Sequence, residues 1–173
     1  ITGAQGLLGE ACCRLLKDDY LIIPLTRADV DLSDTIKLSE TLSKLEFDFL
    51  INNAAMSGLE QFLDQPENAM QVNSTSPRVM AEICHQKGSK MLQVSTDYVL
   101  EGRKNIIHEE ASRTHGSGVY SKTKLAAEQA VMQACENSVI GRVSWLFGYG
   151  RETFVDQVVN TAIAGERACY IWD

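Results

Sequence analysis

The stretch ITGAQGLLGE, residues 1–10, places Gly3, Gly6 and Gly9 between a short apolar segment and an amphipathic helix. Glycine permits a tight turn, lets the backbone approach a pyrophosphate, and lets a helix pack closely against a strand. The free N–H groups at the start of that helix would face the phosphates. A plain glycine-rich turn is the alternative, since the spacing is GxxGxxG rather than GxGxxG. The position of the three glycines at a strand–helix junction favours a dinucleotide-binding site over a plain turn.

Apolar periodicity alternates between helix and strand along the rest of the chain. Helices are predicted at residues 7–16, 34–45, 77–87, 120–136 and 153–164, and strands at 21–25, 47–51, 91–95, 138–147 and 168–172. Ser33 is the predicted N-cap of the second helix, and Gly88 ends the third. The pattern predicts an α/β fold, a Rossmann-type doubly wound parallel sheet with helices on both faces. Residues 1–173 would form one NAD(P)-binding domain, expected to lack part of the first strand and a C-terminal substrate region.

Composition narrows the class of protein. The 173 residues are 45% hydrophobic and 23% charged, which suits one globular domain with a sizeable core. The net charge of −7 argues against binding to nucleic acid or a membrane surface, and no apolar run approaches the length of a membrane span. Five cysteines predict reduced thiols in a cytoplasmic protein, and three scattered histidines offer no metal-ligand spacing. The oligomeric state stays open, a homodimer included.

The end of the second predicted strand, within PLTRADVDLSD (24–34), bears on the type of dinucleotide. In NAD sites an acidic residue here holds the ribose hydroxyls of the adenosine. This chain has Thr26 instead, followed by Arg27, whose guanidinium could pair with a 2′-phosphate. The sequence therefore favours NADP over NAD, with a plain surface arginine as the alternative. Asp31 and Leu32 lie where the following turn could contact the adenine.

The third predicted strand ends in LINNAAMS, residues 50–57. Ala54 and Ala55 follow the strand at a point where a larger side chain would block a ligand. Small residues at the carboxyl end of a strand suit close passage of a dinucleotide. A simple asparagine turn at Asn52 and Asn53 explains the same stretch nearly as well.

The fourth predicted strand ends in QVSTDYVLEG, residues 93–102. Ser95, Thr96 and Asp97 cluster there, next to the point where the strand order of a doubly wound sheet reverses, and ligands bind at that point. Hydroxyl groups in this place can reach an oxygen atom of a substrate. Capping of the following loop is the alternative.

The stretch VYSKTKLAAEQ, residues 119–129, places Tyr120 one helical turn before Lys124. Tyrosine has a pKa of about 10 and is a poor acid–base group at neutral pH. A lysine one turn away and an oxidised nicotinamide both favour the phenolate, so a lowered pKa of Tyr120 is expected. Thr96 would hold a substrate oxygen while Tyr120 exchanges its proton, and Lys124 could also hydrogen-bond the cofactor ribose. A half-buried tyrosine beside a solvated lysine is the alternative.

Taken together, these motifs resemble the dTDP-4-dehydrorhamnose reductase family of the extended short-chain dehydrogenase/reductase superfamily. The resemblance is carried, in this order along the chain, by TGAQGLLG, RADVDLSD, INNAA, DQPENAMQVNSTSP, STDYVLEG, YSKTKLAAE and RVSWLFGYG. It implies an NAD(P)H-dependent oxidoreductase of dTDP-rhamnose biosynthesis, which reduces the 4-keto group of a nucleotide-linked 6-deoxyhexulose. The family continues past the end of this chain into a smaller substrate-binding region.

The resemblance also implies roles for individual residues. The catalytic set would be Thr96, Tyr120 and Lys124, with Tyr120 as proton donor. Substrate contacts would come from Thr96, Asp97, Tyr120 and Trp145. The cofactor would be lined by the glycine turn with Leu7 and Leu8, by Thr26, Arg27, Asp31 and Leu32, by Ala54, Ala55, Met56 and Ser57, and by Tyr120 and Lys124.

The chain departs from the family pattern in places that border the expected ligands. Thr26 stands where the family usually has aspartate, the segment SGLEQFL (57–63) differs from the usual TAVDKAE, GSG (116–118) replaces Pro-Leu-Asn, and Ser121 replaces glycine. These changes leave the identity of the sugar open.

Two alternatives to this reductase follow from the same resemblance. One is another nucleotide-sugar enzyme of the superfamily, an epimerase or a dehydratase. A dehydratase needs an acid–base pair after the threonine, and here Asp97 is followed by Tyr98. The other is a non-catalytic, dinucleotide-binding regulatory subunit similar to the beta subunit of methionine adenosyltransferase.

Overall fold

Helices and strands alternate along the chain as the sequence predicts. The computed structural model describes residues 1–58, 62, 64–102 and 107–167. Its helices are α1 (Leu7–Leu16), α2 (Thr35–Lys44), α4 (Pro66–Met70), α5 (Ser76–Lys87), α6 (Val119–Ala134) and α7 (Phe154–Ile163), and its strands are β1 (Phe49–Asn52), β2 (Lys90–Thr96) and β3 (Ser138–Val143). The predicted strand at 168–172 lies outside the described residues.

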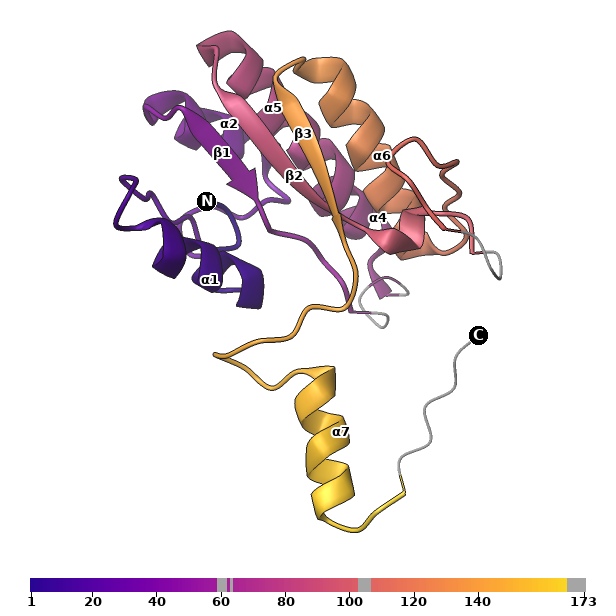
Figure 1. Ribbon diagram of the computed structural model, residues 1–173. Helices are drawn as coiled ribbons and strands as arrows, with labels where there is room; N and C mark the ends of the chain where they lie inside the picture. Colours follow the sequence, from indigo (N-terminus) through magenta and orange to yellow (C-terminus); the bar gives the residue numbers. More distant parts are fainter. Residues whose placement is uncertain (59–61, 63, 103–106, 168–173) are drawn as a thin grey trace.

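The three strands form a parallel sheet in the order β1-β2-β3 (Figure 1). Thr2 continues this order, because it forms isolated parallel bridges to Asn52 of β1 on one side and to Leu25 on the other. The chain therefore leaves Thr2 in one direction through α1 and returns past it to β1. Right-handed crossovers in opposite directions place α1 and α2 on opposite faces. This is the predicted doubly wound arrangement, and its reversal point lies between Thr2 and β1.

One predicted strand and one predicted cap differ from the structure. Residues 21–25 form no strand beyond the bridge at Leu25, because the segment pairs with the short stretch 1–4: Ile1 donates to the Ile23 carbonyl and accepts from the Leu25 N–H, and the Ala4 N–H donates to the Leu25 carbonyl. The N-cap of α2 is Asp34, whose carboxylate accepts from the Lys37 N–H at 2.9 Å. Ser33 cannot take that role because its hydroxyl and N–H both bond the Asp31 carboxylate.

The core fills the space between the sheet and the layer of α2, α5 and α6, which Figure 1 shows together on one face. Its fully buried members include Leu38, Leu42, Met80, Cys84, Met91 and Val131. Each such apolar side chain contributes roughly 1.5–3 kcal/mol when it leaves water. Burial also raises the pKa of the Cys84 thiol to about 12, so it stays protonated, and Cys12, Cys13, Cys84 and Cys135 are all free thiols.

Pro77 lies within an almost continuous helical run from Pro66 to Lys87 rather than at its beginning. A proline inside a regular helix removes a hydrogen bond and clashes with the preceding turn. The π-helical turn Gln71–Thr75 comes directly before α5, so Pro77 falls in the first turn of the new register. Gly88 ends α5 in the left-handed conformation, with φ of 69°, as predicted. No helix in the described part of the chain is long and apolar enough to cross a membrane.

Two of the three N-terminal glycines are required by close packing. Gly3 has φ of 63°, and a Cβ atom there would lie 2.9 Å from the backbone nitrogen of Ala54. A Cβ atom on Gly9 would lie 2.1 Å from the Gly3 carbonyl oxygen, which is inside any allowed contact distance. Gly9 thus lets α1 pack directly on the turn that precedes it.

We expect Gly9→Ala to lower the free energy of unfolding by about 3 kcal/mol, because α1 must move away from the turn to admit the methyl group. Urea unfolding measures this change. Gly102→Ala is the control, since a Cβ atom there meets nothing within 4 Å. Equal stability of the two variants would contradict the close packing of α1.

Candidate active site

The carboxyl end of β2 and the start of α6 bring the predicted catalytic residues together. Thr96 is the last residue of β2, and Tyr120 and Lys124 lie on the first two turns of α6, which packs on that strand. Lys124 is only 3% exposed, and its Nζ donates to the Val94 carbonyl at 2.7 Å. The lysine is therefore a buried group of the sheet edge, and the alternative of a solvated lysine is wrong.

Tyr120 is half-buried within an aromatic surround. Its ring centroid lies 5.6 Å from that of Phe62 and 6.4 Å from that of Tyr98, the latter in an edge-on arrangement. Burial raises the pKa of Tyr120, hydrogen bonding to the Thr96 hydroxyl opposes this, and the negative charge of Asp97 adds to it. Burial therefore outweighs the lowering of the Tyr120 pKa that the sequence predicts from Lys124, whose ammonium bonds the Val94 carbonyl, and the effect of an oxidised nicotinamide stays a prediction. A phenol that keeps its proton at neutral pH suits the role of a proton donor.

Burial acts in the opposite direction on the neighbouring cation. Loss of water around the ammonium lowers the pKa of Lys124 to about 8, and the charge of Glu128 opposes that decrease. Lys124 is thus largely protonated at neutral pH but titrates far closer to it than an exposed lysine does.

A chain of buried amide groups connects Lys124 to the N-terminal turn. Thr2 donates from its hydroxyl to Asn52 Oδ1 at 2.5 Å, and Asn52 Nδ2 donates to Gln93 Oε1 at 2.7 Å. Gln93 Nε2 then donates at 2.8 Å to the same Val94 carbonyl that accepts from Lys124. Thr2, Asn52 and Gln93 are at most 2% exposed, so these buried hydrogen bonds fix the register of neighbouring strands at the carboxyl edge of the sheet.

Asn73 joins the two halves of the site, and the sequence analysis assigned it no role. It lies on the π-helical turn, is 1% exposed, and accepts from the Met56 N–H at 2.8 Å. Its amide group donates to the Met56 carbonyl at 2.9 Å and to the Thr123 hydroxyl at 3.1 Å. It thereby ties the segment after β1 to α6. The proline inside the helical run marks this distortion, and π-helical turns often occur at functional sites.

The N-terminal turn offers the features that a dinucleotide needs. No side chain caps α1 at Gly6, so the first-turn N–H groups of Leu7 and Leu8 remain free to meet an anion. Gly3 brings this turn against Ala54 at the end of β1. The loop continues through Ala55, Met56 and Ser57, of which Ala55 and Ser57 are exposed. The arrangement fits a pyrophosphate, and contact of these residues with a dinucleotide stays a prediction.

The end of the second predicted strand carries a carboxylate that the sequence analysis left out. Asp29 accepts from both the N–H and the hydroxyl of Thr26, at 2.8 and 2.7 Å. The Arg27 side chain is 85% exposed, and its guanidinium lies 3.8 Å from the Asp31 carboxylate. Bonds from Ser33 lower the pKa of Asp31 and keep it ionised. Arg27 therefore remains accessible to an anion, beside two negative charges.

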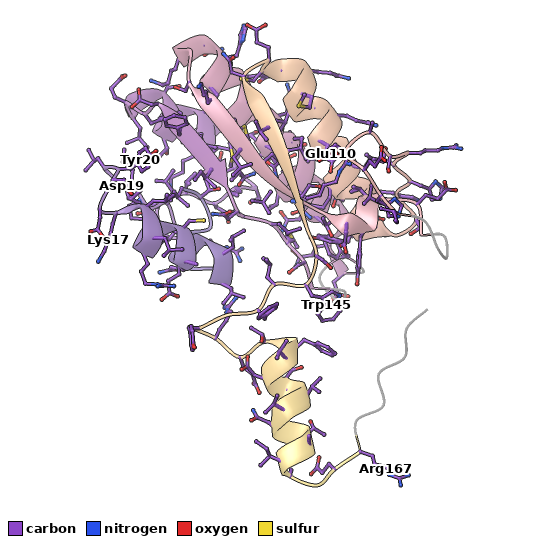
Figure 2. All side chains as sticks on the ribbon, in the orientation of Figure 1. Lys17, Asp19, Tyr20, Glu110, Trp145 and Arg167 are labelled. Atoms are coloured by element: carbon purple, nitrogen blue, oxygen red, sulfur yellow. The ribbon has the colours of Figure 1, made fainter. Side chains whose placement is uncertain are left out.

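Asp97 and Trp145, the predicted substrate contacts outside the catalytic set, differ in their surroundings. Asp97 Oδ1 accepts from the Thr96 hydroxyl at 3.3 Å, so Asp97 lies beside the candidate catalytic threonine. Trp145 lies in the segment between β3 and α7, where Figure 2 shows it below the sheet, and its ring centroid is 4.7 Å from that of Phe154. Its place against a substrate stays a prediction. Part of the variant segment 57–63 lies outside the described residues.

A cavity elsewhere in the protein lies away from these residues. A largely apolar cavity of about 600 Å³ lies between residues 21–25 and β1, at the amino end of the sheet. It does not include Thr96, Tyr120 or Lys124, and ligands of doubly wound sheets bind at the opposite end of the strands. Among the residues that the structure describes, no cluster of His, Cys, Asp and Glu side chains could hold a metal ion.

The fold and these residues define a Rossmann-type α/β domain with a tyrosine, a lysine and a threonine at the carboxyl edge of its sheet. The family model described as "RmlD substrate binding domain" matches residues 1–173, and the chain belongs to that family.

Known proteins of similar sequence and structure agree with this membership. The chain is 32% identical over 162 residues to the dTDP-4-dehydrorhamnose reductase of Streptomyces griseus, covering 92% of this chain and 53% of that protein. It is 28% identical to the spore coat polysaccharide biosynthesis protein SpsK of Bacillus subtilis, covering 94% and 58%. The crystal structure of a dTDP-4-dehydrorhamnose reductase from Clostridium acetobutylicum superposes with a TM-score of 0.87 at 28% identity, covering 94% and 58%.

A second similar structure was solved with a bound dinucleotide. The dTDP-4-dehydrorhamnose reductase of Bacillus anthracis, in complex with NADP, has a TM-score of 0.87 and 26% identity, covering 94% of this chain and 59% of that one. The chain thus spans little more than half the length of the proteins that it matches.

The buried ammonium of Lys124 predicts a specific dependence of stability on pH. Its pKa of about 8 in the folded protein lies below the ordinary 10.5, so the unfolded chain binds more protons between these values. The free energy of unfolding should therefore rise between pH 8 and 10.5, by about 3 kcal/mol from this group. Lys124→Met should remove that rise in urea unfolding, whereas Lys122→Met, at an exposed position, should retain it. An unchanged pH profile in Lys124→Met would contradict the buried charge.

Proposed function

We propose that this chain forms the cofactor-binding and catalytic part of an NAD(P)H-dependent reductase that acts on the 4-keto group of a nucleotide-linked 6-deoxyhexulose. The observation that carries the proposal is the Tyr120 phenol beside Thr96, with the buried Lys124 one turn away. Similarity to proteins named dTDP-4-dehydrorhamnose reductase supports the substrate class, and the NADP complex of one of them supports the cofactor. We propose the same residues as the catalytic set: Thr96, Tyr120 and Lys124.

Each member of this set has a distinct task in the proposed reaction. The Thr96 hydroxyl holds the keto oxygen of the sugar next to the phenol. Bound NADPH or NADH would supply the hydride that reduces the keto carbon. Tyr120 gives its proton to the same oxygen as negative charge develops there. Lys124 stabilises the phenolate that remains and can hydrogen-bond the ribose of the cofactor.

The remaining predicted contacts divide between cofactor and substrate. We propose that the pyrophosphate lies on the turn formed by Gly3, Gly6, Leu7, Leu8 and Gly9, and that the dinucleotide then passes Ala54, Ala55, Met56 and Ser57. Asp97 and Trp145 are proposed to contact the sugar. Exposed N–H groups and small residues support the first assignment, and the hydrogen bond between Asp97 and Thr96 supports the place of Asp97.

Tyr120→Phe tests the proton donor. Turnover should fall by roughly 10²–10⁴-fold, because the variant has no proton to give, while NADPH binding stays nearly unchanged. The measurement is oxidation of NADPH with a panel of 4-keto nucleotide sugars, using the whole protein. Tyr149→Phe, at a side chain 98% exposed, is the control and should keep full turnover. Full activity of Tyr120→Phe on a substrate that the natural protein reduces would refute the mechanism.

The same experiment separates the proposal from its alternatives. Tight dinucleotide binding with no turnover on any sugar of the panel would favour a non-catalytic regulatory subunit. With a non-keto nucleotide-linked hexose added to the panel, loss of water without net change of the cofactor would favour a dehydratase. Failure to bind either NADPH or NADH would remove the basis of all three interpretations.

The preference between NADPH and NADH depends on Arg27. We propose that NADPH binds more tightly, because the exposed guanidinium can pair with a 2′-phosphate despite Asp29 and Asp31 nearby. Arg27→Gln should weaken NADPH binding by roughly tenfold and leave NADH binding unchanged, as measured by fluorescence titration. Arg14→Gln, an exposed arginine on α1, should change neither affinity. Equal loss for both cofactors in Arg27→Gln would argue against recognition of the phosphate.

A further inference from the structure

A partly buried ion pair joins α6, which carries Tyr120 and Lys124, to β3. Glu128 on α6 is 5% exposed, and Arg142 on β3 binds both of its carboxylate oxygens. Arg142 Nε lies 3.0 Å from Oε1, and Nη2 lies 2.7 Å from Oε2. The remaining guanidinium nitrogen, Nη1, lies 3.4 Å from the carbonyl oxygen of Glu110. Glu110, labelled in Figure 2, lies in the segment before α6. The pair is therefore fixed from a helix, a strand and a loop.

Glu128 shares a helical face with Lys124. The two residues are four positions apart on α6, so their side chains lie one turn from each other on the same side. Both are almost fully buried, and burial of a lone ammonium strongly favours its neutral form. The Glu128 carboxylate is the charge that opposes this effect on Lys124.

Arg142 fixes the orientation of the Glu128 carboxylate. Because the guanidinium takes both carboxylate oxygens, Glu128 is held toward β3 while the Lys124 ammonium bonds the Val94 carbonyl on β2. Without Arg142, the Glu128 carboxylate would be free to bond the ammonium directly and to compete with the Val94 carbonyl for it. The three side chains together keep one net positive charge, which is what a neighbouring phenolate requires.

The other charged or titratable groups named on the neighbouring elements do not take the place of the Glu128 carboxylate beside Lys124. Tyr120 on α6, and Asp97 and Tyr98 after β2, lie on the side of the substrate and are part of the candidate site. The π-helical turn that packs on α6 carries only uncharged residues, Gln71–Thr75. On α5, Arg78 and Glu82 pair with each other at the surface.

We propose that Glu128, held by Arg142, is a positioning residue that keeps the Lys124 ammonium charged and directed at the carboxyl edge of the sheet. The catalytic meaning of this role depends on the proposed reductase function, whereas the electrostatic coupling does not. Glu128 touches neither substrate nor cofactor in this proposal and acts through Lys124 alone.

The direct test follows the titration of Lys124 itself. In protein labelled with ¹³C at lysine Cε, the Lys124 resonance is identified by its loss in Lys124→Arg, and its chemical shift is followed against pH. Glu128→Gln should lower the titration midpoint of Lys124 by roughly one pH unit, since it removes a nearby charge. Glu128→Asp keeps the charge, so its Lys124 midpoint should stay close to that of the natural protein.

The matched control is Glu82→Gln, which breaks the exposed Arg78–Glu82 pair and should leave the Lys124 midpoint unchanged. If Glu128→Gln proves too unstable to study, the double variant Glu128→Gln/Arg142→Gln retains amide partners without charge and should still lower the midpoint. A folded variant lacking the Glu128 charge with an unchanged Lys124 midpoint would overturn the proposal.

Activity gives a second readout that separates the two proposals. Where the protein reduces a sugar nucleotide, the alkaline limb of the kcat profile should move to lower pH in Glu128→Gln by the same amount as the Lys124 midpoint. A titration shift without turnover on any substrate would refute the reductase function and leave the coupling intact. A titration shift with an unmoved kcat profile would show that Glu128 does not act on catalysis through Lys124.

Discussion

The hydrogen bond from Lys124 Nζ to the Val94 carbonyl holds inside the protein a group that is largely charged at neutral pH. Removing an ion from water costs several kcal/mol, and the interior must return that energy through hydrogen bonds and opposite charge. The bond to Val94, the nearby Glu128 carboxylate and its Arg142 partner do so together. Much of the architecture around the carboxyl edge can be understood as support for this one ammonium.

That support also fixes the position of α6. Val94 accepts from Gln93 as well as from Lys124, and Gln93 is joined through Asn52 to Thr2 at the N-terminal turn. One chain of buried hydrogen bonds therefore sets the positions of a predicted cofactor-binding turn and of a proposed catalytic side chain. Satisfied polar networks of this kind add rigidity, whereas a missing member leaves its partners buried and unpaired. The site thus gains its geometry from the strands as much as from the helix.

Burial also explains why Tyr120 and Lys124 differ from the simple expectation. Loss of water favours the neutral form of each group, so it raises the pKa of the phenol and lowers that of the ammonium. The tyrosine then holds its proton more firmly and the lysine less firmly than usual, so the two pKa values move apart, with that of Lys124 the lower. Sequence spacing could place the two groups one turn apart, but it could not give the degree of burial that decides these directions.

Much of the fold was predictable because its signals are local. The glycine turn, the alternation of apolar periods and the stop at Gly88 each depend on a few neighbouring residues, and the structure has α1, α5 and the three parallel strands in the predicted places. The errors have local causes too. Ser33 was displaced as a cap by Asp34 because Asp31 had already bound its hydroxyl.

The sequence by itself determined the order of the elements and the turn at which only glycine fits. It also placed a threonine at the end of a strand and a tyrosine and a lysine at the start of a helix. Only the tertiary structure decided that Asn73 would bind both Met56 and Thr123, that Asp29 would fold back on Thr26, and that Glu128 would face Arg142. Those contacts join residues whose partners are chosen by packing, as elements far apart in the chain come to share one buried edge, and no short-range pattern records that choice.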